Sequence, residues 1–151
     1  MKKHLILCPV DFSDSTEPAI RLAANLAQAN KSKIVLLHVI DPNEKAMNME
    51  DLQITQFQER VRDQYLVKND VEFEHFIRHG DPADVAVEFA KQHAVDIIVM
   101  GTHGRTGLAG MVVGSVAKNV LAHASCPVVT VKMPSQSKNK SPRQPSSATP
   151  S

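Results

Sequence analysis

The segment VDIIVMGTHGRTGLAGMVVGSVAKNVLA, residues 95–122, decides the fold class of this chain. Apart from Asp96 it begins with a run of Val, Ile and Met, then passes through a glycine-rich stretch and ends in apolar residues three and four positions apart. A short apolar run without alternation is typical of a strand buried on both faces, whereas the later spacing is typical of a helix. The segment therefore predicts a strand, a loop and a helix in succession, which is the repeating unit of parallel sheets.

The same alternation of strand and helix patterns occupies most of the chain. Four buried strands are predicted at 4–10, 33–40, 95–100 and 127–132. A fifth strand at 71–78 alternates between apolar and polar residues, so we expect it at an edge of the sheet. The helical stripes between them are Ile20, Ala23, Ala24 and Ala27; Leu52, Phe57, Val61 and Tyr65; Val85, Ala86, Phe89 and Ala90; and Val116, Ala117, Val120, Leu121 and Ala124. This order predicts an α/β protein with one open five-stranded parallel sheet and helices on both faces.

Two of the helix starts carry recognisable capping residues. Asp81 is expected to cap the third helix, because Pro82 follows it at the first helical position. Asp14 or Ser15 is expected to cap the first helix, shortly before Pro18.

Length and charge restrict the class of protein. The 151 residues suit one domain, which we expect at 1–134, followed by a low-complexity tail at 135–151 that we expect to be disordered. The formal net charge is +1, and three of the 17 Lys and Arg residues lie in the tail, which leaves 14 basic against 16 acidic residues in the domain. A near-neutral domain argues against binding to nucleic acid. No apolar run is long enough for a membrane span, and the short apolar run near the N-terminus does not resemble a secretory signal, so we expect a cytoplasmic protein.

Cysteine and histidine give no metal or disulfide signal. Cys8 and Cys126 both lie in apolar, strand-like contexts, where small buried side chains are expected. The seven histidines are scattered without the spacing of a metal site. We therefore expect no metal bound directly by side chains.

The glycine-rich stretch at 101–115 is the first candidate site, because it contains five of the six glycines of the chain. Glycines let backbone N–H groups approach an anion closely, and the helix start at Gly114 and Ser115 adds further donors and the positive end of the helix dipole. His103 and Arg105 add donors or charge. These features suit a polyphosphate, although a surface loop in which glycine only turns the chain has the same composition. The spacing matches neither a P-loop nor the dinucleotide-binding pattern G-x-G-x-x-G.

Two other strand ends carry candidate residues. Asp11 follows the first strand, where a carboxylate can bind a ribose hydroxyl or can cap the turn. The second strand ends in residues 37–40, where apolar and backbone groups suit a purine ring, although His38 by itself is better explained as a packed core residue. In open α/β sheets ligands bind at the carboxyl edge, where the strand order reverses. An order of 3-2-1-4-5 would place the first and fourth strands at that point.

The spacing Gly101-x2-Gly104-x9-Gly114-Ser115 resembles the ATP-binding signature of the universal stress protein family. Four other stretches fit the same family in order and spacing, namely 9–13, 80–82, 96–101 and 124–129. The resemblance covers residues 2–132.

The resemblance implies the order 3-2-1-4-5 and an adenine nucleotide over the first and fourth strands. It implies that Asp11 holds the ribose. The expected neighbours of the adenine are Pro9, Val10 and Val39, those lining the site are Met100 and Gly101, and those around the phosphates are Gly104, Gly114, Ser115 and Val116, with His103 and Arg105 nearby. ATP is the expected ligand, with ADP and AMP as alternatives, and Mg²⁺ is expected to be held mainly by the phosphate oxygens.

The last strand suggests a homodimer. Family members commonly pair this strand antiparallel across a two-fold axis, and the residues in question here are Val128, Val129, Thr130 and Val131. In a monomer they would form an exposed apolar edge, and pairing with a second copy covers such an edge.

Three functions remain open from the sequence. The first is a nucleotide-dependent switch that regulates a stress response through an unknown protein partner. The second is a slow ATP hydrolase, for which no general base is evident and the Walker elements are missing. The third is a protein-interaction module that binds no nucleotide.

Overall fold

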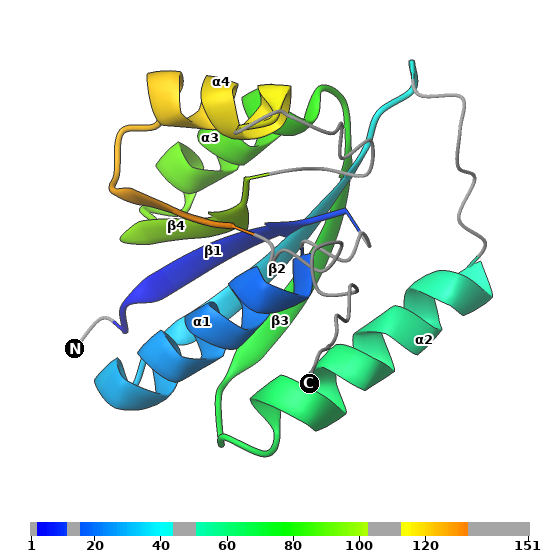
Figure 1. The fold of residues 1–151 in the computed structure, drawn as a ribbon, viewed down its shortest axis with the longest axis vertical. Coiled ribbons are helices and arrows are strands. Elements are labelled where there is room, and N and C mark those ends of the chain that lie inside the picture. Colours follow the sequence, from blue (N-terminus) through cyan, green and yellow to red (C-terminus); the bar gives the residue numbers. More distant parts are fainter. Residues whose placement is uncertain (1–2, 12–15, 44–50, 103–112, 133–151) are drawn as a thin grey trace, which may run out of the picture.

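The computed structural model describes residues 3–11, 16–43, 51–102 and 113–132, and it contains alternating strands and helices (Figure 1). In chain order the elements are β1 (Leu5–Val10), α1 (Thr16–Asn30), β2 (Lys33–Ile40), α2 (Asp51–Val61), the π-helical turn η1 (Arg62–Leu66), β3 (Phe73–His79), α3 (Pro82–Gln92), β4 (Ile97–Gly101), α4 (Ser115–His123) and β5 (Val128–Val131). Each predicted strand and helix is present. The predicted tail, 135–151, lies outside the described residues.

The five strands form one parallel sheet in the order β3-β2-β1-β4-β5. This confirms the predicted fold class and strand order. The alternating strand β3 lies at one edge, as its pattern indicates, and β5 lies at the other. β1 and β4 are neighbours at the centre, where the order of the strands reverses.

Helices cover both faces of the sheet (Figure 1). Residues of α1, α2 and η1 pack on one face, where they bury Ile6 and Cys8 of β1. Residues of α3 and α4 pack on the other face, where they bury Leu7. Successive strand residues point to opposite faces, so central strands covered on both sides need the continuous apolar runs that the sequence shows.

The predicted apolar stripes are wrong at two positions. In α2, Leu52 is 65% exposed, whereas Ile54 is only 9% exposed and packs inward with Phe57 and Val61. The spacing from Ile54 to Phe57 to Val61 is three and then four residues, which keeps these side chains on one helix face, while Leu52 lies on another. In α4, Leu121 is 47% exposed, because α4 packs over β5 at the edge of the sheet.

Two further expectations about burial are corrected. Each residue of β5 is only partly buried, since a strand at an edge has a neighbour on one side alone. Cys8 is buried as predicted, and burial raises the pKa of its thiol to about 12. Cys126 is partly exposed rather than buried, and neither cysteine forms a disulfide.

Candidate functional site

The carboxyl ends of β1 and β4 form the centre of the candidate site, as the topology predicts. After β1 the chain continues to α1 on one face of the sheet, and after β4 it continues to α4 on the other face. Asp11 follows the last residue of β1, and Gly101 is the last residue of β4. This is the position at which open α/β sheets bind ligands.

Pro9 explains where the pairing of β1 with β4 ends. Leu5 exchanges hydrogen bonds with Asp96, so the odd-numbered residues of β1 direct their backbone groups toward β4. The recorded register between the two strands ends at the pair Leu7 and Ile98. Pro9 occupies the next position that faces β4 and has no N–H to donate. The carboxyl halves of β1 and β4 are therefore not held together by the ladder, whereas β1 stays paired with β2 along its whole length.

The start of α4 lacks a side-chain cap. Gly114 is its N-cap residue, no side chain accepts a hydrogen bond there, and the first turn carries no acid. The Gly114 N–H donates to the carbonyl oxygen of Thr102, which fixes the helix start to the end of β4. By contrast, α3 has the predicted cap, because Asp81 accepts a hydrogen bond of 3.0 Å from the Asp84 N–H. The first-turn N–H groups of α4 thus have no side chain of their own helix in front of them.

The backbone at Gly114 does not require glycine. Its φ of −75° and ψ of 170° are open to any L-residue. Glycine at this position is therefore not explained by an unusual backbone conformation, and its consequence is the absence of a side-chain cap. Backbone N–H donors without a side-chain cap and the positive end of a helix suit a phosphate group.

Asp11 has a structural contact at the same edge. Its Oδ1 accepts a hydrogen bond of 2.9 Å from the Thr16 hydroxyl, and its N–H donates to the same hydroxyl oxygen at 3.3 Å. These bonds tie the end of β1 to the start of α1, so the turn-capping interpretation of Asp11 has direct support. A carboxylate accepts several hydrogen bonds, so this contact is compatible with a ligand at the other oxygen.

The other predicted site residues differ in exposure. The side chains of Val10 and Met100 are buried, so only their backbone is suited to contact a ligand. Partly exposed or exposed positions at this edge are Pro9, Val39, Gly101, Ser115 and Val116. His103, Gly104 and Arg105 lie outside the described residues.

Two histidines lie beneath the α1 and α2 side of the sheet. His38 is 5% exposed and its Nδ1 lies 3.2 Å from the carbonyl oxygen of Val10, to which it donates, so it is the packed core residue that the sequence predicts. His75 of β3 accepts a hydrogen bond of 2.7 Å at Nδ1 from the Gln58 amide of α2. Burial, together with the nearby His38, lowers the pKa of His75 to about 4.

Sequence reasoning did not single out His75 or Thr102. His75 lies in an alternating strand pattern that gives no sign of its buried partners. Thr102 directly follows β4 and is buried, and its role depends on backbone bonds to distant segments. No sequence pattern signals such bonds.

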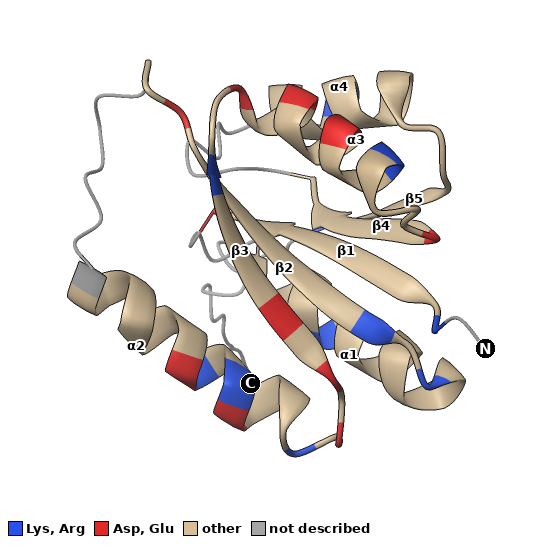
Figure 2. Cartoon of the chain, turned by 180° about the vertical axis from the view of Figure 1, so that it is seen from behind, with Lys and Arg blue, Asp and Glu red and all other residues tan. Residues whose placement is uncertain are grey.

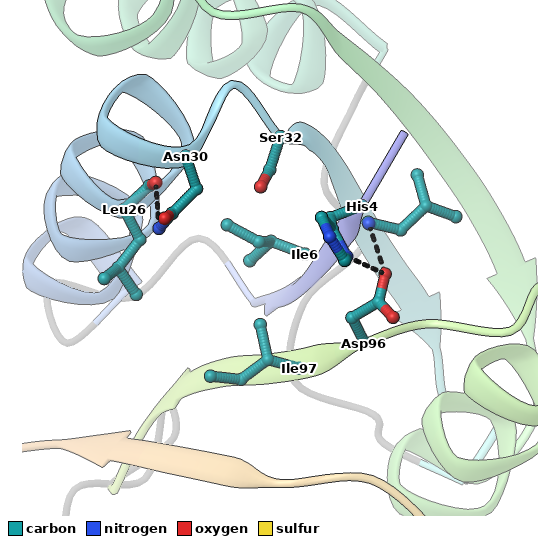
Figure 3. A pocket seen from close by; sticks show the side chains of 8 residues that line it. His4, Ile6, Leu26, Asn30, Ser32, Asp96 and Ile97 are labelled. Atoms are coloured by element: carbon teal, nitrogen blue, oxygen red, sulfur yellow. Dashed lines mark hydrogen bonds and ion pairs between the residues drawn. The ribbon is translucent and has the colours of Figure 1, made fainter. Parts of the chain in front are cut away.

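A hollow of about 430 Å³ lies at the opposite, amino edge of the sheet (Figure 3). It is lined by residues of β1, α1 and β4, by His4 and Asp96 directly before the two strands, and by Ser32 between α1 and β2. Asp96 accepts a hydrogen bond of 2.8 Å from the Leu5 N–H and lies 3.4 Å from the ring of His4. Ligands of parallel sheets bind at the carboxyl edge rather than here. We therefore assign the candidate site to the carboxyl ends of β1 and β4.

A comparison with known proteins identifies the family. The sequence profile of the Universal stress protein family matches residues 4–132. The chain belongs to the universal stress protein family. The resemblance seen in the glycine spacing thus identified the correct family.

Individual members of the family resemble this chain over most of their own length. The universal stress protein MJ0531 of Methanocaldococcus jannaschii is 33% identical over 143 residues, which covers 85% of this chain and 82% of that protein. The solved structure of MJ0577 from the same organism has a TM-score of 0.78 at 29% identity and covers 89% of this chain and 99% of that chain. A universal stress protein from Archaeoglobus fulgidus, solved in complex with dAMP, has a TM-score of 0.63 at 25% identity and covers 87% of this chain and 98% of that chain.

Other types of site have no support within the described ranges. There, no three His, Cys, Asp or Glu side chains gather in a way that would hold a metal ion. In the same ranges, none of the helices has the length and apolar character needed to cross a bilayer.

Proposed function

We propose that this universal stress protein binds an adenine nucleotide, ATP, at the carboxyl ends of β1 and β4. In this proposal the protein is a homodimeric, nucleotide-dependent regulator of a stress response, and nucleotide binding changes the surface offered to a protein partner. The nucleotide-binding domain is residues 1–134, and residues 135–151 are a tail outside it.

The start of α4 is the observation that carries this proposal. Gly114 leaves the first-turn N–H groups without a side-chain cap, in a backbone conformation that would accept any residue. A side chain of Ser, Thr, Asp or Asn commonly caps the start of a helix. A helix that starts without such a cap, next to the strands where the order of the sheet reverses, is suited to bind an external anion. The capped start of α3 in the same chain shows that this sequence does supply a cap elsewhere.

The relatives support an adenine nucleotide rather than another anion. The Archaeoglobus fulgidus protein, which shares this fold at 25% identity, was solved in complex with dAMP. In the proposed arrangement the adenine lies near Pro9, Val10 and Val39, and Asp11 binds the ribose. The phosphates lie at Gly114, Ser115 and Val116, with Gly104, His103 and Arg105 completing the site, and Mg²⁺ is held by the phosphate oxygens.

The two edges of the sheet differ in a way that supports a dimer through β5. β5 has the sequence Val-Val-Thr-Val and carries no charge, whereas β3 carries Glu74 and Arg78 (Figure 2). Charged side chains protect an edge strand from pairing with another chain. β5 is therefore the edge suited to a second copy. Light scattering at micromolar concentration should give twice the chain mass of 16.5 kDa, and a monomer mass would contradict the dimer.

The site is tested by replacing Gly114 with valine. The φ and ψ of Gly114 accept valine, so we expect the fold to persist while the side chain blocks the phosphates. Isothermal titration calorimetry with Mg-ATP should show binding to the wild type and none to Gly114→Val. Ala122→Val introduces the same side chain at an exposed position of α4 and is the matched control. Unchanged affinity in Gly114→Val, with circular dichroism showing a native fold, would contradict the proposed site.

A further inference from the structure

Thr102 lies where the proposed phosphate site meets the outer strand of the sheet. The residue is 3% exposed. Its backbone N–H donates to the carbonyl oxygen of Val131 at 3.1 Å, and its own carbonyl oxygen accepts from the Gly114 N–H. A single residue therefore joins the N-cap of α4 to the last residue of β5.

The outer side of β5 is directed away from these bonds. The carbonyl oxygens of Pro127 and Val131 accept from N–H groups of the β4 segment, so the odd-numbered residues of this segment face β4. The backbone groups of Val128 and Thr130 therefore point away from β4. Among the described residues no strand lies on that side of β5. These outward groups are the ones that a second copy would pair with.

We propose that nucleotide binding and pairing of two copies through β5 are coupled through Thr102. This inference rests on the proposed function, since it needs both the nucleotide site and the β5 dimer. Phosphates at the start of α4 would hold Gly114, and Gly114 holds the carbonyl group of Thr102. The N–H of Thr102 in turn holds the end of β5. A strand end that is already held loses less conformational entropy when it pairs, so the nucleotide strengthens the dimer.

The coupling is reciprocal, because binding free energies are linked. A dimer holds two nucleotide sites, so saturating Mg-ATP strengthens the dimer by the square of the factor by which dimer formation strengthens Mg-ATP binding at each site. Coupling between sites of this kind is roughly 5- to 150-fold. Two independent measurements must therefore agree through this square.

Thr130→Pro separates the dimer from the nucleotide site. The Thr130 N–H points outward, so proline removes no bond between β4 and β5 but blocks pairing with a second copy. Thr130→Val keeps that N–H and replaces the hydroxyl by a methyl group, so dimer formation that survives Thr130→Val but not Thr130→Pro depends on the backbone of residue 130 rather than on the hydroxyl. Circular dichroism establishes whether each variant keeps the native fold.

The experiment combines sedimentation with calorimetry. Analytical ultracentrifugation gives the dimer Kd of the wild type with and without saturating Mg-ATP, and this result stands even if Thr130→Pro does not fold. Calorimetry gives the Mg-ATP Kd of the wild-type dimer and of the Thr130→Pro monomer. We expect the Thr130→Pro monomer to bind Mg-ATP at least 5-fold more weakly than the wild-type dimer, and saturating Mg-ATP to lower the dimer Kd by the square of that factor.

Different results contradict different parts of the account. If the wild type binds no Mg-ATP, the proposed function fails and the coupling fails with it. If the wild type binds Mg-ATP but its dimer Kd does not change, the coupling alone is overturned. The route is tested by NMR, in which Mg-ATP should slow amide exchange at Thr102 in the Thr130→Pro monomer. Coupling with unchanged exchange at Thr102 would show that another route carries it.

Discussion

Pro9 and Gly114 shape the candidate site through groups that they lack. Pro9 has no N–H, and the pairing of β1 with β4 ends before it. Gly114 has no side chain, and the first turn of α4 has no cap. Both residues could be selected from the sequence by their place in a known motif. The physical reasons became visible only with the register of the strands and the backbone angles.

Asp11 is expected to have two separable roles. Asp11→Ala removes the hydrogen bond to Thr16 and the proposed contact with the ribose, so Mg-ATP affinity should fall by roughly 1–3 kcal/mol, the value of a hydrogen bond to a charged group. Thr16→Val removes only the first of these contacts. Calorimetry on both variants separates the roles, and equal loss of affinity in both would show that Asp11 acts only by holding the turn.

His75 is expected to make stability depend on pH. Its folded-state pKa of about 4 lies below the ordinary value of 6.5, because burial and His38 disfavour the charged ring. The unfolded chain therefore takes up a proton as pH falls below about 6.5, while the folded chain does not until about 4. Folding stability falls in that window. Between pH 7 and pH 5 the loss should be about 1 kcal/mol after allowance for the partial exposure of the ring.

Urea unfolding at pH 7, 6 and 5 measures this contribution. His75→Gln keeps an acceptor for the Gln58 amide but does not titrate, so the pH dependence should be smaller by about that amount. His79→Gln removes an exposed histidine from the same strand and is the matched control. A His75→Gln variant with the full wild-type pH dependence would contradict the assignment.

At the scale of the element, α2 shows the limit of reading a stripe from sequence. The apolar stripe predicted for this helix includes Leu52, but Ile54 is the residue that is buried. Ile54→Ala should therefore lower the free energy of unfolding by about 2 kcal/mol, whereas Leu52→Ala should change it by less than about 0.5 kcal/mol. Urea unfolding of the two variants tests this order, and a larger loss in Leu52→Ala would contradict the packing of α2.

A side-chain cap at the start of α4 should raise the stability of the nucleotide-free protein and weaken its binding of Mg-ATP. Gly114→Asp supplies the missing cap and a negative charge at the positive helix end, so apo stability should rise by about 0.5 kcal/mol. The same carboxylate repels phosphates, so Mg-ATP affinity should fall at least tenfold. Gly114→Ser supplies an uncharged cap and should reduce affinity less. Thermal unfolding and calorimetry on the three proteins provide the test, and binding that is unaffected by Gly114→Asp would place the phosphates elsewhere.

For the whole molecule, the alternation of strand and helix patterns was sufficient to predict the sheet and its two covered faces. The strand order followed from the family resemblance rather than from the patterns themselves. Patterns in one segment report that segment's own burial, so they could not show contacts between segments. The bond from Gln58 to His75 and the two bonds of Thr102 are contacts of this kind. The order of the strands places the predicted site residues of β1 and β4 side by side, and the site itself and its ligand contacts remain predictions.

Native mass spectrometry of the purified protein tests the central claim most directly. The protein should appear as a dimer that carries about one adenine nucleotide per chain, either as purified or after addition of Mg-ATP. Denaturation and mass analysis of the released molecule then identify the nucleotide by its phosphate count. A protein that is free of nucleotide as purified and shows no mass shift with Mg-ATP would contradict the nucleotide-binding account.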